Sequence, residues 1–191
     1  MAGVAGPMRT RDRAGAARFL FGLTAGGVAA GLVLAVPVYL VGHVAGRVLP
    51  DSARVGLLVA VAVALGVADL LGRTPHVWRQ VPQKLVRELP PGTLGLTWGF
   101  DLGLLVTTQK TSSLLWLSIV AVALLDPGLA PVVLVVLSLV AAAGIVALTL
   151  TVWSVVMRGG LGWEWIRRAR WVTGAAMLTA GLGTALLWMV G

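Results

Sequence analysis

The residues best suited to chemistry in this chain are concentrated between positions 101 and 113. Asp101 supplies an acid, Lys110 a base, and the stretch VTTQKTSS at 106–113 supplies hydroxyl and amide groups. Mostly apolar residues surround this cluster on both sides. Asp101 and Lys110 are nine residues apart, about 13 Å on an unbroken helix, so they cannot pair directly. Such a cluster could bind a small polar solute, and Lys110 is suited to an anion.

Other reactive arrangements do not appear in the sequence. It has no cysteine, which excludes thiol redox chemistry, disulfides and cysteine-ligated metals. It also lacks a phosphate-binding Walker loop, an HExxH motif, a GxSxG motif and paired carboxylates. His43 and His76 fall on opposite sides of the membrane in the topology given below, which argues against a haem site. We therefore predict no catalytic residue, no metal and no cofactor, and we do not expect an enzyme.

The composition is that of a membrane protein. Of 191 residues, 58% are hydrophobic and only 12% are charged, against roughly a quarter in ordinary domains. Several continuous apolar runs reach the length of about 20 residues that spans a bilayer. They predict an all-α, polytopic membrane helix bundle rather than a β-barrel. The net charge of +8 comes from arginines between the apolar runs, which favours the lipid bilayer over nucleic acid as partner.

The positive-inside rule favours five spans with the N-terminus in the cytoplasm and the C-terminus outside. A disordered basic tail at 1–18 is expected to precede a single transmembrane domain at 19–191. The excess of Ala, Gly, Val and Arg over Lys suggests a high-GC bacterial genome, and the expected location is the bacterial inner membrane. Six spans, with 94–125 divided in two, are the alternative. Asp69 is expected to pair with Arg73 one helical turn later. The expected spans are 19–48, 55–71, 94–125, 132–157 and 172–190.

The loop at 158–170 is expected to lie at the membrane interface. Tryptophan and arginine are typical of that position, and the arginines could instead recognise an anionic lipid headgroup. The residues concerned are Trp163, Trp165, Arg167, Arg168 and Arg170.

An internal repeat is suggested by GLTAG at 22–26 and GLTWG at 95–99, which match at four of five positions. The offset of 73 places Pro37 opposite Lys110, so each half, about 19–72 and 93–157, would begin with an overlong helix broken near its centre. Matched broken helices are typical of transporter binding sites. The offset also aligns small residues suited to close helix packing, namely Gly22, Gly26 and Ala30 with Gly95, Gly99 and Gly103.

The segment WGFDLGLLVTTQKTSSLLWLSIVAVALLDPGLAP, preceded by the basic stretch WRQVP, resembles the LysE superfamily. Within it the nearest likeness is to the transmembrane domain of the CcdA/DsbD group. The resemblance covers about residues 78–157 and implies transport of small solutes or of reducing equivalents. It also implies three plus three inverted helices, each half opening on a broken helix with a Cys–Pro element. This chain has no cysteine, so the electron-transfer chemistry is not carried over, and five spans depart from six.

Two functions follow from these patterns. The first is a small-solute transporter or exporter with a polar intramembrane site at the broken third helix. The alternative is a non-catalytic membrane subunit or scaffold of a larger complex. Five spans are few for a complete transport path, which suggests a homodimer or a membrane-protein partner. For the transporter we expect a substrate path formed by Pro37, Asp101, Thr107, Thr108, Gln109, Lys110 and Thr111.

Overall fold

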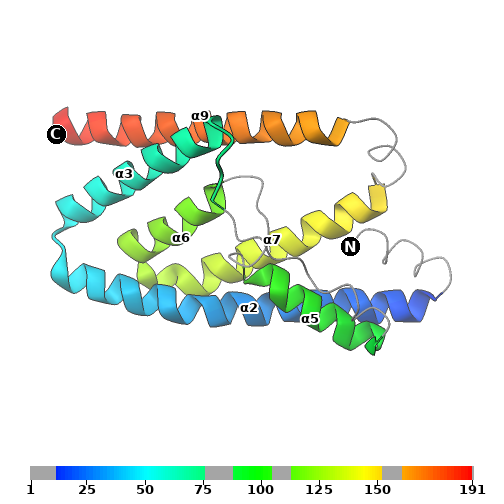
Figure 1. Ribbon diagram of the computed structural model, residues 1–191. Helices are drawn as coiled ribbons and strands as arrows, with labels where there is room; N and C mark the ends of the chain where they lie inside the picture. The colour runs from blue at the N-terminus through cyan, green and yellow to red at the C-terminus, as the bar shows by residue number, and fades with distance from the viewer. Residues whose placement is uncertain (1–11, 76–87, 105–112, 152–160, 191) are drawn as a thin grey trace. The chain divides into compact units, whose positions relative to one another are not determined.

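A computed structural model describes residues 12–75, 88–104, 113–151 and 161–190, with the backbone alone at 145–151, 161–166 and 187–190. These residues form helices and no strand, so the predicted all-α class is confirmed (Figure 1). Within the described part of the chain, three segments are long and apolar enough to cross a membrane, namely Arg13–Val48, Asp51–Leu70 and Pro127–Gly144. The elements are α2 (Arg13–Val48), α3 (Asp51–Leu70), α5 (Pro91–Gly103), α6 (Leu114–Leu125), η1 (Pro127–Leu129), α7 (Ala130–Thr151) and α9 (Leu161–Val190).

The chain packs as two compact units. The first contains α2 as far as Leu34, together with α5 and most of α7. The second contains the rest of α2, with α3, α6, η1 and almost all of α9. The boundary inside α2 lies less than one helical turn before Pro37.

Helix α2 begins earlier than the sequence suggested. Residues 13–18 were expected in the basic tail, but they form the first turns of α2. Asp12 caps this start, because its side chain accepts a hydrogen bond from Gly15 N at 2.9 Å. Aspartate is a favoured N-cap residue, and it sets the helix boundary although the first turns have no apolar periodicity. Residues 1–11 lie outside the described part.

Helix α2 is continuous through Pro37, so the expected break in the first helix is not there. Its 36 residues correspond to about 54 Å, well beyond a hydrocarbon core of about 30 Å. Proline is tolerated inside membrane helices because neighbouring groups satisfy the freed carbonyl.

The apolar run 94–125, expected as one span, forms two helices instead. Helix α5 ends at Gly103 and α6 begins at Leu114. Their 13 and 12 residues correspond to about 20 and 18 Å, so neither helix alone crosses a core of about 30 Å. The five-span topology stays a prediction.

Helix α9 also starts earlier than expected. The last span was predicted at 172–190, after a basic loop, but the helix begins at Leu161. The segment WEWIRRARW contains no proline or glycine, and its polar residues are compatible with an exposed helical turn. The loop between α6 and α7 agrees with the sequence, because DPGLAP forms η1 with the Asp126 side chain accepting from Gly128 N.

In the first unit, α2 and α5 run in the same direction and touch through their backbones (Figure 1). A Cβ atom on Gly99 would lie 2.1 Å from the carbonyl oxygen of Leu23, so only glycine fits there. The adjoining core includes an edge-to-face pair of Phe19 and Trp98, with ring centroids 5.9 Å apart. Small residues at such a contact allow close helix approach in membranes.

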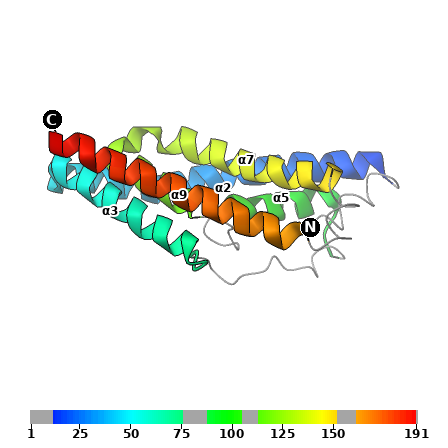
Figure 2. The ribbon, with the colours of Figure 1, turned by 90° about the horizontal axis from the view of Figure 1, so that it is seen from above.

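In the second unit, α3 and α9 run in opposite directions (Figures 1 and 2). Gly66 and Gly174 face each other, and a Cβ atom on either would lie 3.0 Å from the carbonyl oxygen of the other. This contact brings the end of α3 close to the first half of α9.

Candidate functional site

Helix α3 holds the short helix α6 at both ends. Asp69, near the end of α3, accepts a hydrogen bond at 2.8 Å from the backbone N–H of Ser113, which caps the start of α6. Arg54, in the first turn of α3, donates at 3.1 Å to the carbonyl oxygen of Leu124, near the end of α6. Asp69 and Arg54 are fifteen residues apart, which is about 22 Å along α3. This spacing matches α6, whose twelve residues are about 18 Å long, together with the capping residue at each end. Each charge therefore meets the oppositely charged end of the α6 dipole.

Asp69 is almost completely buried, with 1% of its surface exposed. Its Oδ1 accepts from the hydroxyls of Ser113 at 2.6 Å and Thr74 at 2.8 Å. Its Oδ2 accepts from Ser113 N and, at 3.5 Å, from the hydroxyl of Thr173 in α9. A buried carboxylate is tolerable only with such partners, since an uncompensated buried charge costs several kcal/mol. Asp69 thus joins α3, α6 and α9.

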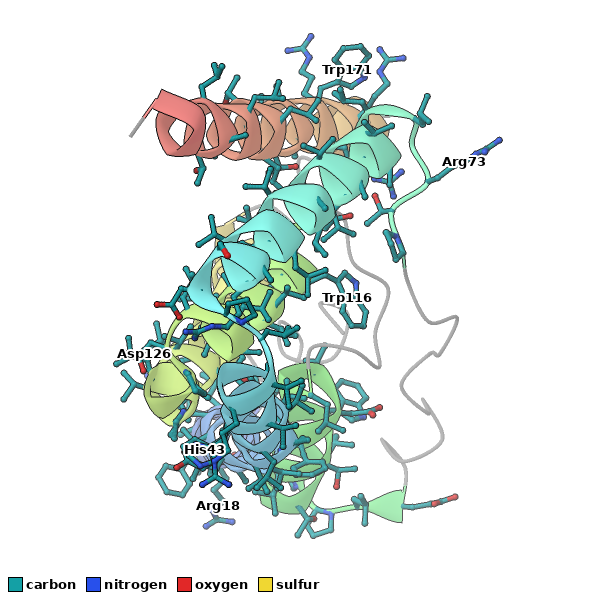
Figure 3. All side chains as sticks on the ribbon, turned by 90° about the vertical axis from the view of Figure 1, so that its left-hand side faces the viewer. Arg18, His43, Arg73, Trp116, Asp126 and Trp171 are labelled. Atoms are coloured by element: carbon teal, nitrogen blue, oxygen red, sulfur yellow. The ribbon has the colours of Figure 1, made fainter. Side chains whose placement is uncertain are left out.

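This arrangement differs from the expected local pair of Asp69 with Arg73. Arg73 extends away from the helices (Figure 3). Gly72, at φ +70°, ends α3 in a left-handed conformation, and the N–H of Arg73 donates to the carbonyl oxygen of Ala68. This end is a Schellman motif, which reverses the chain and places Thr74 beside Asp69. Sequence spacing could not reveal it, because the partners of Asp69 lie 5, 44 and 104 residues away.

The residues after the turn are held by α6. Trp116 Nε1 donates to the carbonyl oxygen of Pro75 at 3.0 Å, and Figure 3 shows its ring beside this stretch of chain. Thr74 is buried with 3% exposure. Asp69, Thr74, Ser113 and Thr173 together are called the Asp69 cluster. The hydrogen bond from Trp116 holds the backbone next to this cluster in place.

The end of α5 is held by a different helix. Ser138 of α7, 1% exposed, donates from its hydroxyl at 2.9 Å to the carbonyl oxygen of Gly103. The last carbonyls of a helix have no partner within it and need one elsewhere when buried. Ser138 thus caps α5 in the first unit, as Asp69 caps α6 in the second.

Ser138→Ala should lower the free energy of unfolding by about 0.5–1.5 kcal/mol, because it removes a donor from a buried carbonyl. Titration with dodecyl sulfate in mixed micelles, followed by circular dichroism, would measure the change. Ser118→Ala is the matched control, since its exposed hydroxyl bonds only to Leu114 O in its own helix. We expect this control to stay within about 0.5 kcal/mol of the unmodified protein. Equal effects of the two changes would contradict a capping role for Ser138.

The structure places only part of the predicted substrate path. Asp101 is buried on α5 with 7% exposure, and Pro37 lies inside α2. The other members of the predicted path lie outside the described residues, namely Thr107, Thr108, Gln109, Lys110 and Thr111. The structure thus brings together a different set of polar groups, the Asp69 cluster.

The packing glycines lie where two helices meet. Gly22 and Gly26 of α2 face Gly92, Leu96 and Phe100 of α5. In return, Gly95 and Gly99 face Phe19 and Leu23, and Gly103 faces Gly27 and Ala30.

The residues predicted to lie at the membrane interface are all in α9. The side chains of Trp163 and Trp165 are outside the described part, and Arg168 is exposed. Arg167 and Arg170 line a pocket of about 300 Å³ with Trp171, beside Asp69. Among the described residues, no group of three His, Asp or Glu side chains could hold a metal ion.

No protein-family model matches this chain, and neither the curated proteins nor the solved structures give a match. The resemblance to the LysE superfamily therefore stays a prediction. The apolar helices long enough to span a bilayer nevertheless indicate the class, which is an all-helical membrane protein.

Proposed function

We propose that this protein is a small-solute transporter of the cytoplasmic membrane, with its polar site where the apolar run 94–125 divides into two helices. The observation that carries the proposal is that α5 ends at Gly103 and α6 begins only at Leu114, although the sequence between 94 and 125 is apolar enough for one span. Neither end is left without a polar partner in the described structure, since Ser138 caps α5 and Asp69 caps α6.

Paired half-helices are typical of transporter binding sites. A helix end has several backbone groups without a partner inside the helix, and one capping side chain satisfies only one of them. The remaining groups and the partial charge of the helix end can bind ions and polar solutes. Helix ends at membrane depth are tolerated only where they are buried in protein or line water. A membrane subunit with a purely packing role has no need of such a division. The sequence adds the polar composition of residues 106–113, and the resemblance to the LysE superfamily supports the same function.

Rigid anchoring of α6 also suits this function. A half-helix fixed at both ends by Arg54 and Asp69 keeps its N-terminus in one place while neighbouring segments move. Hinge and rocking motions in transporters take place around such a fixed site. Pro37 lies inside α2, and proline is a common position for a helix to bend.

Water access tests the proposal, and the absence of native cysteine makes the test clean. Single cysteines at each position from 104 to 112 would be placed in the protein in membranes. A membrane-impermeant maleimide applied from either side, with a permeant thiol reagent as control, would report access. Transport predicts labelling at consecutive positions that changes with the side of addition. Cysteines at Ala62 and Ala142, both buried in helix contacts, should stay protected and serve as references.

Protection at every position from 104 to 112 would contradict the proposal. The protein would then be better described as a packed, non-transporting membrane subunit. Cysteine at Ser113 is left out of the series, because that position belongs to the Asp69 cluster and would disturb α6.

A further inference from the structure

A pocket in the second unit lies between the end of α3 and the first half of α9. Its volume is about 300 Å³, at the lower end of the range of small-molecule sites, about 300–1,000 Å³. It therefore suits a headgroup-sized ligand better than a nucleotide or a large cofactor. Its lining is Leu70, Leu71 and Gly72 from the end of α3, Arg167, Arg170 and Trp171 from α9, and Asp69.

The charge of the lining favours an anion. Arg167 and Arg170 are three residues apart in α9, so their side chains lie on the same face of the helix. Guanidinium groups bind phosphate through two parallel hydrogen bonds. Asp69 is the opposing charge, but it is 1% exposed and accepts hydrogen bonds from Ser113 and Thr74. The charged side chains of the lining are therefore two guanidinium groups and one carboxylate, which gives the pocket a net positive charge.

The rim of the pocket is apolar. Leu71 is 67% exposed and Trp171 is 58% exposed, and Figure 3 shows Trp171 on the outer side of α9. Gly72 adds no side chain, and a Cβ atom at that position would have no neighbour within 4 Å. Arginine beside tryptophan and leucine is typical of the membrane interface, where a headgroup continues into acyl chains.

We infer that this pocket binds the phosphate of an anionic phospholipid headgroup. The inference is independent of transport, because the pocket would fix the protein to a lipid whether or not a solute crosses. A soluble phosphate ester offers the same charge but has no acyl chain to lie against Leu71 and Trp171. The apolar rim therefore favours the lipid as the source of the phosphate.

The test uses the full chain in detergent and native mass spectrometry with two probes of equal chain length, a phosphatidylglycerol and a phosphatidylcholine. The unmodified protein should retain phosphatidylglycerol with roughly tenfold preference. The double variant R167Q/R170Q should lose that preference. The matched control R73Q/R168Q removes the same charge from residues that do not line the pocket, and should keep it.

Three results would overturn the inference. The first is a lack of preference in the unmodified protein, which needs no variant and so does not depend on folding. The second is an equal loss in both double variants, which would show a general charge effect. The third is displacement of the lipid by glycerol phosphate at comparable concentration, which would assign the pocket to a soluble phosphate compound. Circular dichroism of each variant would establish that its helices are intact.

Discussion

Asp69→Ala should destabilise the protein by roughly 2–5 kcal/mol, the largest effect expected of a single substitution here. The change removes the acceptor for the Ser113 N–H and for the hydroxyls of Ser113 and Thr74. Alanine leaves these donors buried without that acceptor, and α6 loses the negative charge at its N-terminus. Hydrogen bonds in membrane proteins average only about 0.6 kcal/mol, so the size of the effect depends on several being lost together. Dodecyl sulfate titration followed by circular dichroism would measure it.

One further variant separates the loss of the Asp69 charge from the loss of its side-chain shape, and a second serves as a control. Asp69→Asn keeps one oxygen, which can accept from Ser113 N, while the hydroxyls can turn to accept from the new amide. We expect a smaller loss than for alanine. Asp51→Asn is the control, because Asp51 is a carboxylate of the same helix that forms an exposed ion pair with Arg54. Exposed pairs contribute about 0–1 kcal/mol. An Asp69→Ala variant no less stable than Asp51→Asn would contradict the role of Asp69.

The sequence allowed the helical class to be predicted because the apolar runs are long and continuous, which is a property of composition alone. Helix boundaries were harder where a single side chain decides them. Asp12 starts α2 ahead of any apolar pattern, and Pro37 does not end it. The division of 94–125 was only the alternative, because two full spans there would place the arginine-rich loop 158–170 outside, against the positive-inside rule.

The Asp69 cluster was missed for a different reason. Its members come from α3, α6, α9 and the turn after α3, and no local spacing links them. The available signal was a lone acid at the end of an apolar helix, and a basic residue one turn later offered a simpler partner. The packing glycines, in contrast, could be predicted from local spacing. Gly22, Gly26, Gly95 and Gly99 follow the helical period, so one helix face could be assigned without knowing what it contacts.

The contact between α2 and α5 has a property that bears on the predicted repeat. Gly22 approaches Gly92 and Leu96, while Gly95 approaches Phe19 and Leu23. Adding the offset of 73 to Phe19 and Leu23 gives Gly92 and Leu96. Gly22 and its repeat partner Gly95 therefore contact equivalent positions on the opposite helix. Reciprocity of this kind is typical of a two-fold interface, here between helices running in the same direction. The inverted halves implied by the LysE resemblance would instead place equivalent helices in opposite directions.

Gly99→Ala should destabilise the protein by about 1–3 kcal/mol, because its Cβ atom would lie 2.1 Å from the carbonyl oxygen of Leu23. The obstacle is backbone, so a rotamer change cannot relieve it and the helices must separate. The same titration would measure the loss. Gly144→Ala in α7 is the control, since a Cβ atom there has no neighbour within 4 Å. Alanine at this control site should be neutral or stabilising by about 0.5–1 kcal/mol, as is usual inside a helix.

The reciprocal contact predicts a similar effect at the glycine that matches Gly99 in the other helix. Gly26 is the partner of Gly99 at the offset of 73, and its Cβ atom would lie 2.2 Å from the carbonyl oxygen of Leu96. Gly26→Ala should therefore cost about as much as Gly99→Ala, and the double variant less than the sum, because helices already separated by one methyl group accommodate the second. A large loss for one glycine with none for the other would contradict a symmetric contact. Additive losses would show instead that each glycine packs in an independent environment.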